Sequence, residues 1–119
     1  WPALLQVEGG QGQAAEGQAG VRVQLGHLLQ AGGRAAAAAV MLAETLASTA
    51  ANLCVAEGQQ AVGLEINANH VRAATEGVVT GTARALHVGR STQLWEIRIE
   101  DGAGRLVCIS RMTAAVVGP

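Results

Sequence analysis

The main pattern in the chain is a long run of apolar and small residues, AAAAAVMLAETLASTAANLCVAEG, at positions 35 to 58. Alanine, leucine and methionine favour helices, and neither proline nor glycine interrupts the run before Gly58, so we expect one long helix that ends there. Glu44 is the only charged residue between Arg34 and Glu57. A helix that is apolar on nearly all sides must be covered by other parts of a protein, which makes a carboxylate at its centre a candidate functional group.

Strands are expected on both sides of this run, because apolar and polar residues alternate there in steps of two. The alternation is clearest in residues 92–101, where Trp95, Ile97 and Ile99 share one face of the expected strand. The Asp-Gly pair in residues 101–104 is typical of a hairpin turn. Further strands are expected at residues 3–8, 21–25, 61–74, 78–89 and 105–117, with a connection at 9–20, a loop at 26–34 and a turn at Gly77.

This order of elements predicts an α+β fold. Two strands, one long helix and four further strands are expected to give an antiparallel sheet with the helix laid on one face, and with the last four strands in meander order. In the first of these four, Val62, Leu64 and Ile66 alternate with other residues and are expected to share a face. The 119 residues suit a single domain with one core, spanning residues 1–119.

Composition argues against several classes of function. The net charge is −1 and the eight basic residues, all arginine, are scattered, so nothing indicates a nucleic-acid partner. The long helix could cross a bilayer, but much of it is alanine, and Glu44, Thr45 and Ser48 interrupt it, so no membrane partner is expected. The histidines at positions 27, 70 and 87 lack the spacing of metal ligands, so no metal site is expected.

The cysteines and the N-terminal residues favour a cytoplasmic protein. Cys54 and Cys108 are far apart in the chain, which fits two free thiols in a reducing compartment. The first residues, WPALLQVEGG, lack the basic and apolar regions of a secretory signal. Residues 9–39 consist largely of Gly, Ala, Gln, Val and Leu, whereas residues 40–117 have an ordinary composition. A GC-rich source would account for part of this contrast, and a stretch that was altered or filled in with small residues would account for the rest.

Three strings, LAETLAS, VGLEINANHVRAATEG and LHVGRSTQLWEIRIED, resemble the hotdog-fold acyl-CoA thioesterases of the phenylacetate and menaquinone/enterobactin type. The resemblance covers residues 40–117. It implies a sheet wrapped around a long central helix, two subunits joined edge to edge, a homotetramer made of two such dimers, and an active site at the subunit interface. It also implies hydrolysis of an acyl-CoA, here expected to be an aryl-CoA, with no cofactor beyond the coenzyme A of the substrate.

The resemblance assigns roles to individual positions. Glu44 matches the carboxylate that acts as nucleophile or general base, and Ser48, one helical turn later, matches the hydroxyl that orients water. The family has a His-Gly-Gly segment at the helix start, where a backbone amide polarises the thioester carbonyl. This chain has alanines there, at positions 35 to 37, so the amide of Ala36 remains the oxyanion candidate while the family's histidine is missing. A family glutamine falls on Leu29, beside Gln30.

Coenzyme A carries phosphates, so an enzyme that acts on it needs cations near the mouth of its site. In the family, two segments line the nucleotide and pantetheine channel. The matching candidates are His70 and Arg72, two residues apart and so expected on one strand face, and a turn group that consists of His87, Gly89, Arg90 and Ser91. For each of these residues an ordinary solvated surface is the alternative. Glu44 could instead be a structural residue that pairs with an arginine or faces water, and the Ser48 hydroxyl could bond back to the preceding turn of the helix.

Two other functions stay open. The alanines at positions 35 to 37 would also suit a non-catalytic hotdog module that binds acyl-CoA without hydrolysing it. A hydratase or dehydratase on the same fold ranks lower, because these enzymes pair a histidine with an acid and no such histidine lies near the helix start.

Overall fold

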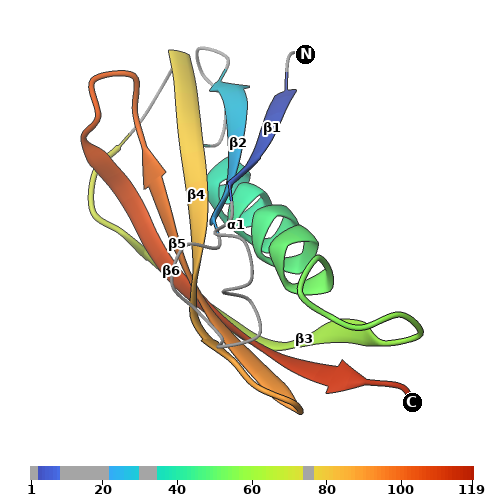
Figure 1. Ribbon diagram of the computed structural model, residues 1–119. Helices are drawn as coiled ribbons and strands as arrows, with labels where there is room; N and C mark the ends of the chain where they lie inside the picture. The colour runs from blue at the N-terminus through green and yellow to red at the C-terminus, as the bar shows by residue number, and fades with distance from the viewer. Residues whose placement is uncertain (1–2, 9–21, 30–34, 74–76) are drawn as a thin grey trace.

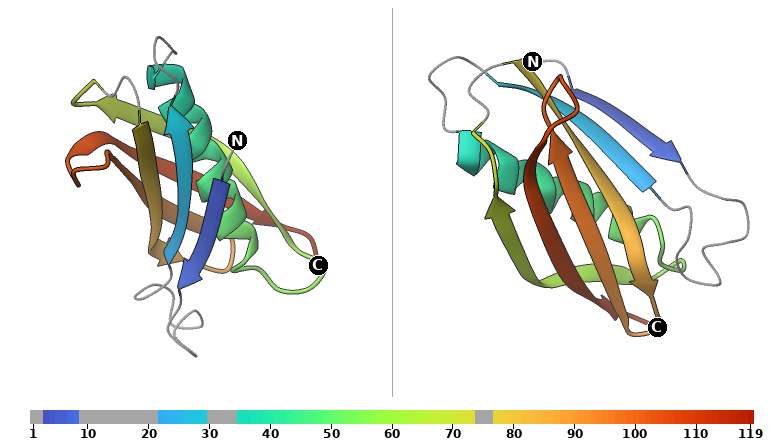
Figure 2. Two further views of the ribbon diagram at one scale, coloured as in Figure 1. Left: turned by 90° about the horizontal axis from the view of Figure 1, so that it is seen from above. Right: turned by 90° about the vertical axis from the view of Figure 1, so that its left-hand side faces the viewer.

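The computed structural model describes residues 3–8, 22–29, 35–73 and 77–119. The elements are β1 (Ala3–Glu8), β2 (Arg22–Leu29), α1 (Ala35–Asn52), β3 (Gln60–His70), β4 (Gly77–Val88), β5 (Thr92–Glu100) and β6 (Leu106–Val117). The strands form one antiparallel sheet in the order β1-β2-β4-β5-β6-β3, and α1 lies across one face of it (Figures 1 and 2). The predicted α+β fold, with one helix on an antiparallel sheet, is therefore confirmed.

The core lies between α1 and the sheet. The predicted apolar face of β5 is correct, because Trp95, Ile97 and Ile99 are all fully buried. Burial of each such side chain stabilises the fold by about 1.5–3 kcal/mol relative to an exposed position. From the helix, the largest contribution comes from Leu46, which is also fully buried. A Cβ atom at Gly81 of β4 would lie only 3.0 Å from Leu46 Cδ2, so this glycine lets the helix approach the sheet closely.

The helix ends earlier than predicted, at Asn52 rather than at Gly58. The N–H of Cys54 donates to the carbonyl of Ala51 at 3.1 Å, three residues back, so the last turn tightens and the helix does not continue. Gly58 belongs instead to the following turn, where its φ of 84° is a conformation that favours glycine. The composition of residues 53–58 favoured a helix, but backbone hydrogen bonds to the end of α1 override that preference.

The predicted meander order of the last four strands is wrong. Strands β4, β5 and β6 are consecutive neighbours, but β3 pairs with β6 at the edge of the sheet and not with β4. The reason is that β2 occupies the side of β4 that a meander would give to β3. As a result, β3 has a strand neighbour on one side only among the described residues.

A β-bulge divides β3 and overturns the prediction that Val62, Leu64 and Ile66 share a face. The register shifts between Gly63 and Glu65, so Leu64 is an extra residue without a direct partner on β6. Because the alternation reverses there, Ile66 is half-buried, whereas Val62 and Leu64 are exposed by 42% and 63%.

Strand β2 is longer than predicted and replaces the first part of the expected loop at 26–34. It runs to Leu29 because its backbone pairs with β1 on one side, up to His27, and with β4 on the other, up to Leu29. The expected connection at 9–20 and the rest of that loop lie outside the described residues. The hairpin turn predicted at 101–104 is confirmed, with Asp101 Oδ1 accepting hydrogen bonds from the N–H groups of Ala103 and Arg105 at 3.0 and 2.9 Å.

Candidate functional site

One long face of α1 is not covered by the sheet. Its buried residues, such as Leu42 and Leu46, contact the core, whereas Met41, Glu44 and Ser48 are exposed. The expectation that the helix is covered on nearly all sides is therefore wrong for the described chain, because its few polar residues gather on one face. No helix among the described residues is long and apolar enough to cross a membrane.

The structure brings Glu44 and Ser48 together. Both side chains, one helical turn apart, line a cavity of about 300 Å³ between α1 and the edge strand β3. The opposite wall is the bulged part of β3, residues 63–66, and Met112 of β6 also lines the cavity. A carboxylate and a hydroxyl thus face the same space, beside exposed and half-buried apolar side chains that could contact an acyl group.

The backbone amide of Ala36 is in the first turn of α1, where N–H groups have no partner within the helix. The amides at a helix start carry partial positive charge and can stabilise an oxyanion. Ala36 precedes Glu44 by two turns of the same helix, or about 12 Å along the axis at 1.5 Å per residue. One chain alone therefore does not place this amide and the Glu44 carboxylate around the same carbonyl carbon.

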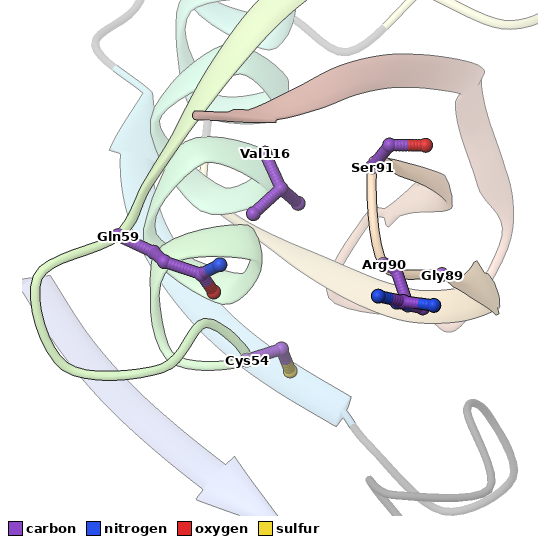
Figure 3. Close-up of a pocket in the computed structure, with 6 residues that line it drawn as sticks. All are labelled: Cys54, Gln59, Gly89, Arg90, Ser91 and Val116. Atoms are coloured by element: carbon purple, nitrogen blue, oxygen red, sulfur yellow. The ribbon is translucent and has the colours of Figure 1, made fainter. Parts of the chain in front are cut away.

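A second cavity, of about 610 Å³, contains three of the predicted coenzyme A contacts. Gly89, Arg90 and Ser91 of the β4–β5 turn lie on one side of it, and Cys54 and Gln59 lie on the other (Figure 3). Val116 of β6 also lines this cavity. The Arg90 side chain is exposed and forms no ion pair within the described part of the chain, so its guanidinium can receive an anion. Burial raises the pKa of the Cys54 thiol, which disfavours a role as a thiolate nucleophile.

The remaining predicted contacts lie elsewhere. The ring of His87 lies against Gly89, since a Cβ atom at Gly89 would be 2.6 Å from His87 Nε2, so this glycine makes room for the imidazole. His70 is exposed at the end of β3 and Arg72 follows the strand, and neither lines the two cavities above. The prediction that His70 and Arg72 share one strand face is wrong, because the N–H groups of residues 71 and 72 both turn to the carbonyl of Val107.

Two amide side chains near the end of α1 were missed by the sequence reasoning. Asn52 bonds to the backbone of Ala61 in β3, and Gln93 of β5, almost completely buried, bonds to the carbonyl of Ala51. The only signal for Asn52 was its polarity in an apolar run, and nothing in the local sequence distinguishes Gln93. Among the described residues, no group of three or more His, Cys, Asp or Glu side chains could hold a metal ion.

Comparison with known proteins agrees with this arrangement. The sequence profile of the thioesterase superfamily matches residues 35–108. The Vibrio cholerae protein VC_A0580 is 66% identical over 79 residues, which are 66% of this chain and 53% of that protein. The 1,4-dihydroxy-2-naphthoyl-CoA hydrolase of Escherichia coli is 52% identical over 80 residues, which are 67% of this chain and 59% of that protein. The chain thus spans little more than half the length of these relatives.

The protein PA1618 of Pseudomonas aeruginosa connects sequence and structure. It is 52% identical over 81 residues, which are 67% of this chain and 56% of that protein. The crystal structure of a mutant of thioesterase PA1618 superposes with a TM-score of 0.79, covering 97% of this chain and 82% of that chain at 35% identity. Identity falls from 52% over 81 residues to 35% over 97% of the chain, so nearly all identical positions lie within the 81-residue stretch. The fold continues beyond that stretch, and the predicted family resemblance and hotdog fold are confirmed: the chain belongs to the thioesterase superfamily.

Proposed function

We propose that this protein hydrolyses acyl-CoA thioesters, with Glu44 as the catalytic carboxylate. The observation that carries the proposal is the cavity between α1 and β3, into which Glu44 and Ser48 both project in a chain of the thioesterase superfamily. An aryl-CoA is the proposed substrate class, in line with the name of the Escherichia coli relative, 1,4-dihydroxy-2-naphthoyl-CoA hydrolase.

The reaction adds water across the carbon–sulfur bond. As a general base, Glu44 accepts a proton from a water molecule that hydrogen-bonds to the Ser48 hydroxyl, and the hydroxide attacks the thioester carbonyl. The carbon–sulfur bond then breaks, the thiolate of coenzyme A leaves and takes up the proton, and the carboxylic acid is released. As a nucleophile, Glu44 would itself attack the carbonyl, so that the carbon–sulfur bond breaks, the thiolate of coenzyme A leaves and a mixed anhydride forms. Water then hydrolyses this anhydride to the carboxylic acid and the free Glu44 carboxylate.

A second copy of the chain completes this proposed site. The Ala36 amide lies two helical turns from Glu44 in the same chain, so the oxyanion donor for one Glu44 would come from the partner subunit. The edge of β3, which pairs only with β6 among the described strands, offers backbone groups for edge-to-edge pairing. We therefore propose a homodimer, and by resemblance a homotetramer of two dimers.

The proposed coenzyme A contacts are the turn group, where Arg90 binds a phosphate and Ser91 and the Gly89 backbone lie beside it. His87, next to Gly89, and the exposed residues His70 and Arg72 at the end of β3 are further candidates on the surface. We place the protein in the cytoplasm, with Cys54 and Cys108 as free thiols.

The test is thiol release from a panel of aryl-CoA and alkyl-CoA substrates. We expect Glu44→Gln to lower kcat by about 10²–10⁴-fold, the range of general-base contributions, and Ser48→Ala to lower it less. Glu57→Gln is the matched control, because Glu57 is an exposed glutamate in the turn after the same helix. A Glu44→Gln variant as active as the parent would rule out the proposed mechanism.

A non-catalytic acyl-CoA-binding module is the second candidate. The alanines at positions 35 to 37, in place of His-Gly-Gly, favour it. It predicts that a CoA ester binds in calorimetry while no thiol appears over hours, whereas steady hydrolysis at enzymatic rates excludes it.

A further inference from the structure

The side chain of Asn52, the last residue of α1, connects the helix to the edge strand β3. Its Oδ1 accepts a hydrogen bond from the N–H of Ala61 at 2.9 Å, and its Nδ2 donates to the carbonyl of Ala61 at 3.2 Å. Nδ2 also donates to the carbonyl of Ser48 at 2.9 Å. One amide group therefore satisfies both backbone groups of a strand residue and at the same time fixes its own orientation on the helix.

The two bonds to Ala61 replace those that a neighbouring strand would make. Strand β3 pairs with β6 on one side, and near its start the Asn52 amide occupies the other side. Ala61 itself is buried, so without Asn52 its N–H and C=O would lose their partners in a place with little access for water. Buried backbone groups without partners are costly, so the strand would move away from the helix until water reaches them.

Asn52 also stands in line with the proposed catalytic residues. Glu44, Ser48 and Asn52 are spaced four residues apart and so lie along one face of α1. Ala61, which Asn52 holds, is two residues before Gly63, where the opposite wall of the cavity begins. The distance between the two walls of the cavity is therefore fixed at one end by the Asn52–Ala61 pair.

We propose that Asn52 is a positioning residue that sets the width of the cavity between the Glu44–Ser48 face of α1 and β3. Its catalytic consequence rests on the thioesterase function proposed above, whereas its effect on the cavity does not. Gln93 anchors the other side of the helix end, because its Nε2 donates to the carbonyl of Ala51 at 3.2 Å. Loss of Asn52 thus removes the hydrogen bonds between the helix end and β3, while Gln93 still holds the helix end on the core.

The test compares Asn52→Leu, which removes all three hydrogen bonds at similar volume, with Asn52→Asp, which keeps only the acceptor for the Ala61 N–H. Thr49→Val is the matched control, because it removes one hydrogen bond, from Thr49 Oγ1 to the Thr45 carbonyl at 2.7 Å, that stays within the helix. All variants are studied at temperatures at which circular dichroism finds them fully folded. If Asn52→Leu does not fold, Asn52→Asp takes its place.

Two measurements do not depend on activity. Hydrogen exchange at the Ala61 amide should be at least about tenfold faster in Asn52→Leu, the change expected from the loss of about 1.4 kcal/mol, and unchanged in Thr49→Val. Crystal structures should give a Ser48–Glu65 Cα distance that is about 0.5–1 Å larger in Asn52→Leu, the scale on which site geometry matters for catalysis.

The third measurement is steady-state kinetics. We expect kcat of Asn52→Leu to fall about tenfold with KM changed by less than about threefold, because a displacement of 1 Å can cost up to about 10²-fold in rate. Asn52→Asp should lie between Asn52→Leu and the parent. The proposal is overturned if the cavity width is unchanged, whether or not exchange is faster, or if the cavity widens and kcat matches that of Thr49→Val. If the parent hydrolyses no thioester, the thioesterase function fails, and exchange and cavity width alone decide about Asn52.

Discussion

The buried amide of Gln93 is the most informative target for a stability measurement. Gln93 is 1% exposed and Trp95 is fully buried. Gln93 Oε1 accepts a hydrogen bond from Trp95 Nε1 at 2.8 Å, and Gln93 Nε2 donates to the Ala51 carbonyl at 3.2 Å. Replacement of Gln93 by leucine introduces an apolar side chain of similar size and removes both hydrogen bonds, and it leaves the indole N–H without a partner in the core.

The expected cost follows from these contacts. A buried donor left unpaired costs about 1–3 kcal/mol. The Ala51 carbonyl loses less, because it still accepts from the N–H of Cys54 at 3.1 Å. We therefore expect Gln93→Leu to lower the free energy of unfolding by about 2–3 kcal/mol, which in a domain of this size lowers Tm by about 10 °C.

A double-mutant cycle with Trp95→Phe tests whether the unpaired indole N–H causes the loss of stability, as well as how large that loss is. Phenylalanine has no N–H, so Gln93→Leu leaves no indole donor unpaired in that background. Urea denaturation of the four proteins should then give a coupling free energy of about 1–2 kcal/mol between positions 93 and 95. If Gln93→Leu costs the same in both backgrounds, within about 0.5 kcal/mol, the unpaired indole is not the cause and this reasoning fails.

Two further predictions concern the turn between β5 and β6. Gly104 has a φ of 80° with no atom near its missing side chain, so Gly104→Ala should lower the free energy of unfolding by about 1–2 kcal/mol through backbone strain alone. Gly102→Ala in the same turn is the control, since Gly102 has no such φ, and equal effects of the two changes in thermal denaturation would contradict this account. The pKa of Asp101 is held below its ordinary value, first by the hydrogen bond from the Arg105 N–H and then by those from the Ala103 N–H and the Arg105 side chain. The pKa of this carboxyl is therefore lower in the folded than in the unfolded protein. The stabilisation by the Asp101 carboxylate is therefore complete above the ordinary carboxyl pKa of about 4, and it is lost as the pH falls through the lower folded pKa. Asp101→Asn should reduce this loss of stability when Tm is measured as a function of acid pH. A pH profile of Tm identical to that of the parent would refute this role of Asp101.

Much of the fold was predictable from local patterns. The alternation in residues 92–101 identified the buried face of β5, and the Asp-Gly pair identified the hairpin turn, because both depend on residues close together in the chain. The helix start at Ala35 was also predicted, whereas its end was not. At that end, the N–H of Cys54 turns back to the carbonyl of Ala51, and Asn52 bonds to Ala61 on another element, which the composition of the run did not indicate.

In the candidate site too, local sequence identified residues, whereas their surroundings depend on contacts between distant elements. Glu44 and Ser48 were identified from the sequence, through their spacing on one helix face and a family resemblance. Their surroundings were not: β3 lies beside the helix because it pairs with β6 and bonds to Asn52, and the bulge at residues 63–65 reverses the face that its side chains present. Arg90 and Ser91 share a cavity with Gln59 because of the same long-range arrangement.

The sequence by itself determined which segments form strands and helix and which helix face carries a carboxylate and a hydroxyl, because periodicity and propensity act over a few residues. Only the tertiary structure decided strand order, the exposure of the Glu44 face and the second wall of its cavity. These depend on which backbone edges and apolar faces meet across many tens of residues, and on single amides, Asn52 and Gln93, whose partners lie on other elements.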